Sequence, residues 1–382
     1  MPAESQPSKA NTASVSPDEQ PFARLDAHTV LDALEAIGLR CDGRLQALNS
    51  FENRVYLVGL EDGSSLVAKF YRPGRWTPEQ LREEHQFAHD IAAAEIPLAA
   101  PLARPGSRPG STRAGTPQGQ PAGGPSSKPP NNGDETLFFS HGFAIALYAR
   151  QGGRVPELDN VRDGPAMRER IGQFIARIHQ VGARQPFLHR PPLDGRHDGW
   201  ASVERVIHCP WLPPELRGNW EALARQCCER IEARLNPPEQ PFRQIRLHGD
   251  CHLGNLLWTD AHGPHFVDLD DSRMGPAIQD LWMLADAAGQ QADEAADAHT
   301  SQAMSELLAG YEQIRPFDRR ELGLIEALRT LRIIRHSAWL AERWNDPAFP
   351  AAFPWFGSAR YWQGQILHLQ EQLDALASPV IH

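Results

Sequence analysis

The chain has 382 residues and a formal net charge of −10, and 41% of its residues are hydrophobic. That apolar content supports a large core, so the composition excludes a chain that is disordered throughout, and the length favours two domains or lobes. The acidic balance argues against a nucleic-acid partner, which needs clustered Lys and Arg, and no apolar stretch is long enough for a membrane span.

The N-terminal residues and the cysteines both favour a cytoplasmic protein. Residues 1–22 are rich in Ser, Pro and Ala and lack the apolar stretch of a signal peptide, so we expect a disordered tail there. The five cysteines are odd in number and form no Cys-x-x-Cys pair. That pattern fits a reduced protein better than a disulfide scaffold.

Strand signals dominate the region after this tail. The first predicted elements are a helix and three strands, over 27–37, 45–51, 55–60 and 64–70. An Asp-Gly turn joins the last two strands, and such a turn between apolar runs is typical of a hairpin.

A second helix has a strong start signal. It begins with Thr-Pro-Glu-Gln at 77–80, which supplies an N-cap hydroxyl, a proline at the first helical position and the Gln of a capping box. It should end near residue 95. Glu84 shares the inward face with Leu81 and Ile91, and a carboxylate on such a face needs a partner.

A Pro/Gly-rich window follows at about 101–133. It holds 8 of the 33 prolines and 7 of the 30 glycines, and its charged residues are all basic. We therefore expect a flexible insertion. A further hairpin is predicted after it, over 136–140 and 142–149, and the whole region 23–149 should form one β-rich lobe.

The remaining residues, 150–382, are predicted to form a mainly helical lobe. Helices are expected over 165–181, 216–235, 276–288, 300–314, 318–345 and 358–376. One polar, β-like stretch at 245–271 interrupts them. A small antiparallel sheet with a helix, beside a larger helical lobe, makes this an α+β fold of two unequal lobes.

The densest cluster of reactive side chains lies in the β-like stretch. Asp250 and Asn255 have Asp-x-x-x-x-Asn spacing, and Asp268 follows an apolar pair further along. Upstream, Lys69 lies in an apolar strand and Glu84 on the inward helix face. Taken singly, each of these is more often a turn, edge or surface residue, because Asp and Asn favour turns and Lys favours strand edges.

Taken together, these side chains meet the needs of phosphoryl transfer from ATP, which requires positioning and charge neutralisation more than covalent chemistry. Lys69 can bind phosphates if a carboxylate holds it in place, so we expect it to pair with Glu84. Asp250 can orient or deprotonate an acceptor hydroxyl. The amide oxygen of Asn255 and the carboxylate of Asp268 can hold Mg²⁺, which prefers oxygen ligands.

The His-Gly-Asp…Asn…Asp pattern resembles the aminoglycoside phosphotransferases, choline kinases and homoserine kinases of the protein-kinase-like superfamily. Other segments are more similar to the bacterial stress response kinase A group. These segments are 48–56, 69–76, 83–87, 247–252, 280–284 and 344–350. The resemblance covers roughly 24–376 apart from the insertion. It implies a bilobal protein-kinase-like fold and Mg-ATP-dependent serine/threonine protein kinase activity in a stress response.

The resemblance also implies a role for each matching side chain. Asp250 becomes the catalytic aspartate, and Asn255 and Asp268 become the Mg²⁺ ligands, with Asp268 also counted among the catalytic residues. Lys69 and Glu84 become the pair that anchors ATP. The implied partners are ATP and a protein substrate, the kinase itself included, and we expect a monomer.

Two departures from ordinary protein kinases concern the loop over ATP and the catalytic loop. The resemblance places Ser50 in the phosphate-covering loop, as an ATP-binding residue, but this loop has no Gly-x-Gly-x-x-Gly. His248-Gly249-Asp250 replaces His-Arg-Asp. Without that arginine there is no obvious partner for an activation-loop phosphate, so we expect no activation by loop phosphorylation.

Several alternatives remain open. His248, Asp250 and His252 alternate as ligands of Zn²⁺ or Fe²⁺ do, although that interpretation leaves Asn255 and Asp268 unexplained. The core motif also fits a small-molecule kinase with a choline-, homoserine- or aminoglycoside-like acceptor, because a fold does not fix its substrate. A third interpretation is a nucleotide-binding scaffold with weak or no catalysis.

Other charged side chains have open roles at this point. Asp270 and Asp271 suit either metal binding or a turn, and His252 either orders the catalytic loop or lines the acceptor site. Asp280 is expected to brace the catalytic loop. Three arginines of the helix predicted over 318–345 could line a cleft for an acidic substrate, although a solvated helix face is the default: Arg329, Arg332 and Arg335.

Overall fold

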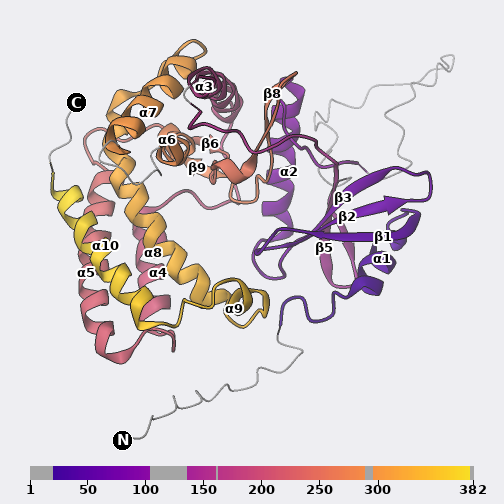
Figure 1. Cartoon of the computed structure of the whole chain (residues 1–382), viewed down its shortest axis with the longest axis horizontal. Helices are drawn as coiled ribbons and strands as arrows, with labels where there is room; N and C mark the ends of the chain where they lie inside the picture. The colour runs from indigo at the N-terminus through magenta and orange to yellow at the C-terminus, as the bar shows by residue number, and fades with distance from the viewer. Residues whose placement is uncertain (1–19, 104–135, 161, 289–295, 379–382) are drawn as a thin grey trace, which may run out of the picture.

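The computed structural model describes residues 20–103, 136–160, 162–288 and 296–378. Figure 1 shows a smaller lobe built on a β-sheet beside a larger helical lobe, with helix α2 (Pro78–Ala93) between them. This is the α+β architecture of two unequal lobes that the sequence predicts. Nearly all of the predicted N-terminal tail and of the predicted insertion lies outside the described residues.

Five antiparallel strands form the sheet of the smaller lobe, in the order β1-β2-β3-β5-β4. They are β1 (Cys41–Leu48), β2 (Arg54–Leu60), β3 (Ser65–Phe70), β4 (Phe138–Ser140) and β5 (Phe143–Ala149). Strand β3 is therefore central, and the register places Lys69 between Val55 of β2 and Ala146 of β5. This position excludes the alternative that Lys69 blunts the edge of the sheet.

Helix α1 (Ala27–Ala36) covers one face of the sheet. Leu34 packs with Ala68 and Phe70 of β3 in one apolar cluster. Because side chains alternate between the two faces of a strand, Lys69 points to the opposite face. The fold thus directs this lysine away from the apolar cluster and towards α2 and the larger lobe.

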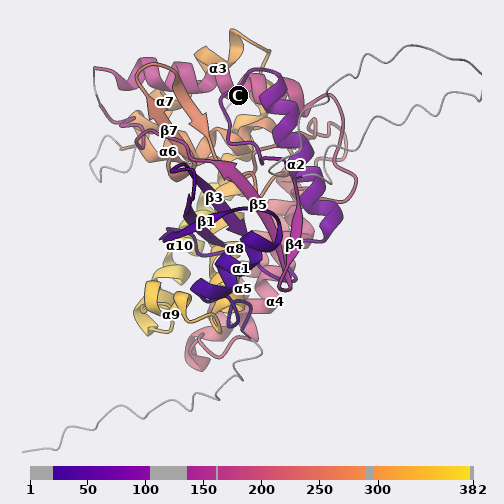
Figure 2. The ribbon, with the colours of Figure 1, turned by 90° about the vertical axis from the view of Figure 1, so that its right-hand side faces the viewer.

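Helix α2 lies on that opposite face and contacts both lobes (Figures 1 and 2). Thr77 caps it, and the capping box that the sequence predicts is present. Leu81 packs with Tyr71 of the smaller lobe, whereas Phe87 and Ile91 belong to the core of the larger lobe. This division of its buried face holds α2, and therefore Glu84, at the boundary between the lobes.

Long and short helices around one shared core make up most of the larger lobe. They are α3 (Gly164–Gly182), α4 (Gly195–Ile207), α5 (Pro214–Leu235), α6 (Trp282–Ala288), α7 (Ala296–Glu312), α8 (Ile325–Arg343), α9 (Ala348–Ala352) and α10 (Ala359–Ala377). None of the helices in the described ranges combines the length and the apolar content that a bilayer crossing requires.

Two short antiparallel strand pairs lie among these helices and carry the polar stretch of the sequence. They are β6 (Ile245–Leu247) with β9 (Arg273–Gly275), and β7 (Leu256–Thr259) with β8 (Gly263–Phe266). Asp250 lies in the segment between β6 and β7, and Asp268 lies in the segment between β8 and β9. The strand pairs therefore bring the two aspartates to the same side of the larger lobe.

The sequence prediction misses helix α4. Its buried face includes Gly195, Gly199 and Ser202, so the helix lacks a continuous apolar stripe. A Cβ added at Gly199 would lie 3.0 Å from the Cys228 sulfur of α5. The glycine therefore allows close packing of α4 on α5 and removes the usual sequence signal of a buried helix.

Some predicted boundaries also differ from the structure. The strand predicted over 45–51 is β1, which begins and ends earlier in the chain. The helix predicted over 318–345 is a 3₁₀ segment, Arg319–Leu324, followed by α8. The side chain of Asp318 accepts a hydrogen bond from the Arg320 backbone amide and starts the 3₁₀ turn.

Candidate active site

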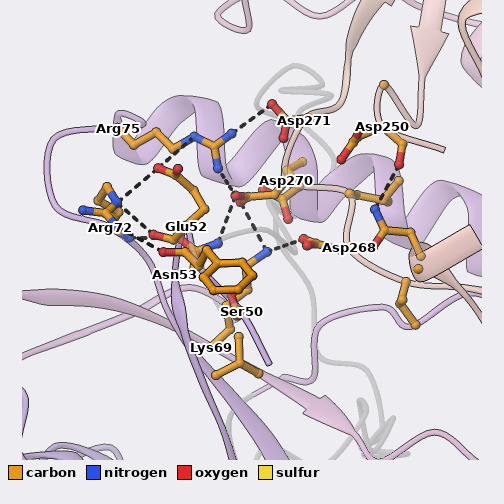
Figure 3. A pocket seen from close by; sticks show the side chains of 18 of the residues that line it. Ser50, Glu52, Asn53, Lys69, Arg72, Arg75, Asp250, Asp268, Asp270 and Asp271 are labelled. Atoms are coloured by element: carbon orange, nitrogen blue, oxygen red, sulfur yellow. Dashed lines mark hydrogen bonds and ion pairs between the residues drawn. The ribbon is translucent and has the colours of Figure 1, made fainter. Parts of the chain in front are cut away.

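A large cleft between the lobes contains every site residue that the sequence predicts. Lys69 and Glu84 reach it from the smaller lobe, and Asp250, Asn255 and Asp268 reach it from the larger one. Ser50 also lines it, from the loop that joins β1 to β2 (Figure 3). Residues about 200 positions apart in the chain therefore meet in one place.

Lys69 is buried at this cleft and bound by carboxylates of the larger lobe. Its Nζ lies 2.8 Å from Asp268 Oδ1 and 3.2 Å from Asp270 Oδ1. Burial alone would lower the pKa of Lys69, but the nearby charges of Asp268 and Asp270 raise this pKa well above its usual value. The lysine is therefore a fixed positive charge that joins the two lobes.

Glu84 has a different partner from the one expected. It is 2% exposed, and its Oε2 lies 3.4 Å from the guanidinium of Arg190. Burial raises the pKa of Glu84 to about 7, although the charge of Lys69 opposes this rise. The ion pairs of Lys69 are those with Asp268 and Asp270, so the predicted Lys69–Glu84 pair is replaced by two separate sets of contacts.

Arg190, which the sequence analysis did not single out, holds Glu84 and the Asp-rich segment together. Its guanidinium donates to the backbone carbonyls of Asp270, at 2.9 Å, and Ser272, at 2.9 Å. It is 3% exposed. No periodic pattern surrounds Arg190 in the sequence, and its partners are about 80 to 106 residues away. Nothing local in the sequence therefore indicates its role.

The carboxylate of Asp250 is held by two side chains, those of Arg332 and His252. Its Oδ1 lies 2.6 Å from Arg332 Nη1, and its Oδ2 lies 3.4 Å from His252 Nε2. Burial would raise the pKa of Asp250, but the hydrogen bond from His252 and the charge of Arg332 together lower it to about 2. The carboxylate is therefore ionised at neutral pH, and His252 helps to orient it.

Asn255 lies beside Asp250, Asp268 lines the same cleft, and both offer oxygen donors. The Asn255 side-chain nitrogen donates to the Asp250 carbonyl at 2.9 Å, which leaves the amide oxygen for another partner. The Val267 backbone amide donates to the Asn255 carbonyl at 3.1 Å and so fixes the neighbouring Asp268. Asp268 has a φ of 61°, a backbone conformation that non-glycine residues adopt rarely and mostly at functional sites.

Asp280 braces the loop that carries Asp250, as the sequence predicts. Its two carboxylate oxygens accept the backbone amides of His248 and Gly249, both at 2.8 Å. His179 Nε2 lies 3.0 Å from the same carboxylate. Gly249 has a φ of 90°, and a Cβ there would lie 2.1 Å from the Asp271 carbonyl. That close approach explains why His-Gly-Asp replaces His-Arg-Asp.

The structure does not favour the alternative of a transition-metal site at His248 and His252. His248 Nε2 lies 3.0 Å from the Val267 carbonyl, and His252 Nδ1 accepts the Gly254 backbone amide at 2.9 Å. Across the described ranges, no three His, Cys, Asp or Glu side chains are grouped as metal ligands. Both histidines instead order the loop around Asp250.

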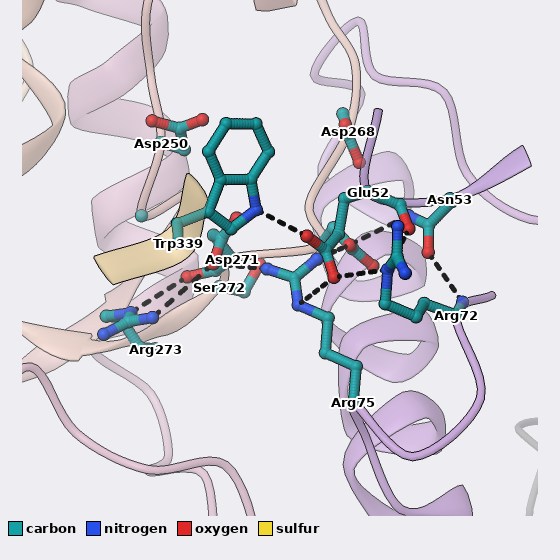
Figure 4. Close-up of polar contacts among 12 residues, drawn as sticks. Glu52, Asn53, Arg72, Arg75, Asp250, Asp268, Asp271, Ser272, Arg273 and Trp339 are labelled. Atoms are coloured by element: carbon teal, nitrogen blue, oxygen red, sulfur yellow. Dashed lines mark hydrogen bonds and ion pairs between the residues drawn. The ribbon is translucent and has the colours of Figure 1, made fainter. Parts of the chain in front are cut away.

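Asp271 belongs to a chain of ion pairs that also contains Arg75 and Glu52 (Figure 4). Arg75 lies 2.9 Å from Asp271 and 3.5 Å from Glu52, and it also pairs with Asp270. On its other side, Asp271 lies 3.5 Å from Arg273. Asp270 and Asp271 occupy a turn closed by the Ser272 amide and the Leu269 carbonyl, so the turn interpretation holds, and the ion pairs add a role for Asp271 between the lobes.

The loop over the cleft is anchored to the larger lobe. The Phe51 ring lies 5.1 Å from the Phe353 ring, centroid to centroid. Glu52 accepts a 2.6 Å hydrogen bond from Trp339 Nε1 and lies 3.0 Å from Arg343. Figure 4 shows Glu52 between Trp339 and the two arginines of the smaller lobe. Side-chain contacts thus position a loop that lacks the glycines of ordinary protein kinases.

A second anchor of the smaller lobe yields a stability prediction. Asp346 is 3% exposed and lies 2.7 Å from Arg54 and 2.8 Å from Arg72. We expect Asp346→Asn to lower the free energy of unfolding by about 3 kcal/mol, because removal of one partner leaves buried charge unpaired. Urea unfolding checks this, with Asp260→Asn as a control that breaks the exposed ion pair with Arg154 and should cost less than about 1 kcal/mol.

The ion pairs of Asp346 with Arg54 and Arg72 also make the free energy of unfolding depend on pH. Burial would raise the pKa of Asp346, but hydrogen bonds from Arg72 and Arg54 lower it overall. Its contribution to stability is therefore complete above about pH 4, the unfolded pKa, and is lost as the pH falls further. The difference in stability between wild type and Asp346→Asn should shrink below that pH, and an unchanged difference would contradict the assignment.

Comparison with known proteins agrees with this arrangement. The phosphotransferase enzyme family matches residues 44–317 of the chain. Stress response kinase A of Escherichia coli (strain K12) is 39% identical over 358 residues, which is 94% of this chain and 95% of that protein. A serine/threonine protein kinase named RdoA from Salmonella typhimurium (strain LT2) is 38% identical over the same shares of the two chains.

Solved structures share the fold at much lower identity. Amicoumacin kinase, solved with AMP-PNP, Ca²⁺ and Ami, is 19% identical with a TM-score of 0.63 over 92% of this chain and 94% of that one. Choline kinase LicA from Streptococcus pneumoniae is 13% identical with a TM-score of 0.58 over 91% and 99%. These matches confirm the predicted protein-kinase-like fold. The chain therefore belongs to the phosphotransferase enzyme family and, within it, to the stress response kinase A group.

Proposed function

We propose that the chain is an ATP- and Mg²⁺-dependent kinase that transfers the γ-phosphate of ATP to a serine or threonine hydroxyl of a protein, in a bacterial stress response. The observation that carries this proposal is that Lys69, Asn255, Asp268 and Asp250 line one cleft between the lobes. Figure 3 shows three of them, Lys69, Asp250 and Asp268. Together the four side chains supply a cation for phosphates, oxygen donors for a metal and a carboxylate for the acceptor.

The nucleotide would bind with its base against the segment that links β5 to the larger lobe. Tyr148, Ala149 and Arg150 line the cleft there. Lys69, which is buried and protonated, would bind the phosphates through charge-assisted hydrogen bonds. The loop that contains Ser50 would cover them, held from the larger lobe by the contacts of Phe51 and Glu52.

Asn255 and Asp268 would hold Mg²⁺. The fit is supported by their chemistry, because an amide oxygen and a carboxylate are the hard donors that Mg²⁺ prefers, and it commonly uses one or two carboxylates together with substrate phosphates. The Asp268 side chain is 48% exposed within the cleft, so it is accessible to a cation. When bound, the metal would neutralise charge on the phosphates. The related amicoumacin kinase structure contains an ATP analogue with Ca²⁺.

Asp250 would orient the acceptor hydroxyl and accept its proton as the phosphate is transferred. The low pKa of this carboxylate, about 2, keeps it ionised and able to accept a hydrogen bond at neutral pH. A carboxylate of low pKa is a weak base, so positioning of the hydroxyl is its main expected contribution. The braces at Asp280 and Gly249 would keep Asp250 in that position.

Transfer of label from ATP distinguishes the acceptors. With γ-³²P-ATP and Mg²⁺, we expect the purified protein to label dephosphorylated casein and to leave choline, homoserine and an aminoglycoside unlabelled. EDTA should reduce the transfer to background, and added Mg²⁺ should restore it, because two protein oxygens and the phosphates together hold the metal. Scintillation counting after separation of protein from small molecules measures both effects.

Two outcomes would overturn the proposal in different ways. Label found only on a small molecule would identify a small-molecule kinase built on the same cleft. Binding of ATP without transfer to any acceptor, the protein itself included, would indicate a nucleotide-binding scaffold. Transfer that continues in EDTA would contradict the assignment of Asn255 and Asp268 as Mg²⁺ ligands.

A further inference from the structure

Four arginines of the larger lobe line the cleft and are here called the arginine wall: Arg205, Arg273, Arg332 and Arg335. Arg332 and Arg335 come from α8, Arg205 from α4 and Arg273 from β9. Positions 332 and 335 are three residues apart on one helix, so the two side chains share a face. The guanidinium of Arg332 already reaches the Asp250 carboxylate, which places this wall where an acceptor must bind.

Arg335 is the member whose charge is least compensated. It is half-buried, and within the described part of the chain its side chain makes no ion pair and no hydrogen bond. The charge of Arg335 acts on Asp271, a carboxylate that Arg75 and Arg273 already hold at 2.9 and 3.5 Å. Arg273 has a second carboxylate partner, Asp198, at 3.2 Å, whereas the charge of Arg335 acts on an Asp271 carboxylate that two other guanidinium groups already contact.

The electrostatics of Arg273 reflect this crowding. Burial, and then the repulsive charge of Arg335, lower the pKa of Arg273 to about 10, against the attraction of Asp198 and Asp271. Arg205 is also weakly compensated, since its partner Glu342 lies 3.8 Å away and both side chains are exposed. Like charges held close together cost free energy unless a counter-charge is present. The wall therefore has the charge that an anionic ligand would neutralise.

We propose that the arginine wall binds acidic side chains that flank the acceptor serine or threonine, so that the kinase selects acidic peptide segments. This inference rests on the proposed protein kinase function and names the substrate class of that site. Guanidinium groups bind carboxylates with strong, directional hydrogen bonds. The same positive wall repels cationic acceptors such as choline or an aminoglycoside, which links the charge of the cleft to its choice of acceptor.

Peptide kinetics test the inference. Three peptides share one central serine and differ in their flanks, which are Asp, Ala or Lys. We expect kcat/KM to fall about tenfold from the Asp to the Ala peptide, and further to the Lys peptide, since a hydrogen bond to a charged group is worth about a factor of ten or more. The preference should weaken as salt rises.

Variants at Arg335 identify the wall as the cause. Arg335→Gln should lower kcat/KM for the Asp peptide about tenfold. The kcat/KM values for the Asp and Ala peptides should then be nearly equal. Arg335→Lys should restore part of the preference, and Arg335→Glu should favour the Lys peptide. The matched control is Arg230→Gln, an exposed arginine of α5 outside the cleft, which should leave all three values unchanged.

Thermal melting separates binding from a structural role. Because Arg335 has no ion pair in the described chain and repels Arg273, Arg335→Gln should have a melting temperature equal to or above that of wild type. Equal use of the Asp and Ala peptides by wild type would overturn the inference and leave the protein kinase proposal standing. Transfer to none of the three peptides, together with labelling of a small molecule, would overturn both.

Discussion

Replacing Asp250 with Asn should lower kcat about a thousandfold and leave the KM for ATP within about threefold of wild type. The Asp250 carboxylate lies on the larger lobe, whereas Lys69 and the loop around Ser50 reach the cleft from the smaller lobe. Loss of the carboxylate therefore removes the group that binds the acceptor hydroxyl and leaves the residues that bind ATP in place. Asn keeps the size of the side chain and loses the negative charge that accepts the hydroxyl proton. Steady-state kinetics with varied ATP and varied protein acceptor measure the two effects separately.

Two further variants test whether the loss of activity in Asp250→Asn comes from the missing carboxylate or from a folding defect. Asp374→Asn, at an exposed position of α10, should behave as wild type. Asp250→Glu should remain well below wild type, because a longer side chain displaces the carboxylate from its contacts with Arg332 and His252. A kcat near normal in Asp250→Asn would show that this aspartate does not position the acceptor. A large rise in the KM for ATP alone would assign it to nucleotide binding instead.

Asp268→Asn should lower kcat at least a hundredfold and raise the Mg²⁺ concentration needed for half-maximal rate by about tenfold or more. Asn lacks the charge that binds a divalent cation, and it also removes the 2.8 Å ion pair with Lys69. Lys69 keeps its second partner, Asp270, at 3.2 Å, so we expect the folded structure to persist. Rates measured over a Mg²⁺ titration give both quantities.

The metal dependence makes this prediction specific. If Asp268 only held Lys69 in place, Asp268→Asn would lower the rate equally at every Mg²⁺ concentration, and that outcome would contradict its role as a metal ligand. Asn255→Ala offers a comparison, because the variant removes the second oxygen donor and also the hydrogen bond to the Asp250 carbonyl. We expect it to shift the Mg²⁺ requirement in the same direction.

The helices and strands that could be predicted from the sequence have signals that lie within a few neighbouring residues. An Asp-Gly turn specifies the β2–β3 hairpin, and Thr77 with Gln80 specifies the start of α2, because turn geometry and helix capping are local. Helix α4 could not be predicted, since its buried face relies on glycines that depend on the position of α5. Its packing is a property of the tertiary structure and has no local periodicity.

The residues of the candidate site also fall into two groups, those with a local sequence signal and those placed by tertiary packing. The spacing of Asp250, Asn255 and Asp268 indicates their grouping, because a short β-hairpin brings them together. The burial of Glu84 shows that it needs a partner but cannot identify that partner. Arg190 approaches Glu84 from a segment without regular structure, and such long-range contacts are set by the packing of the two lobes.

The arginines of α8 show how packing changes the meaning of a pattern. By sequence alone, Arg332 and Arg335 fit a solvated helix face. In the structure, the opposite face of α8 is buried by residues such as Thr330, Ile334 and Ser337, and this directs the arginines into the cleft. Arg329, on the same helix, instead pairs with Asp286 at 2.7 Å. Position along a helix therefore decides which arginine can meet a substrate.

The most direct test of the central claim follows the phosphate itself. An extract from cells that lack this protein is dephosphorylated and supplied with ATP carrying ¹⁸O in the γ-phosphate, together with purified wild type or Asp250→Asn. Mass spectrometry should find heavy phosphate on protein serines and threonines with wild type, and none above background with Asp250→Asn. Heavy phosphate confined to small molecules, or equal labelling of proteins by both forms, would contradict the account.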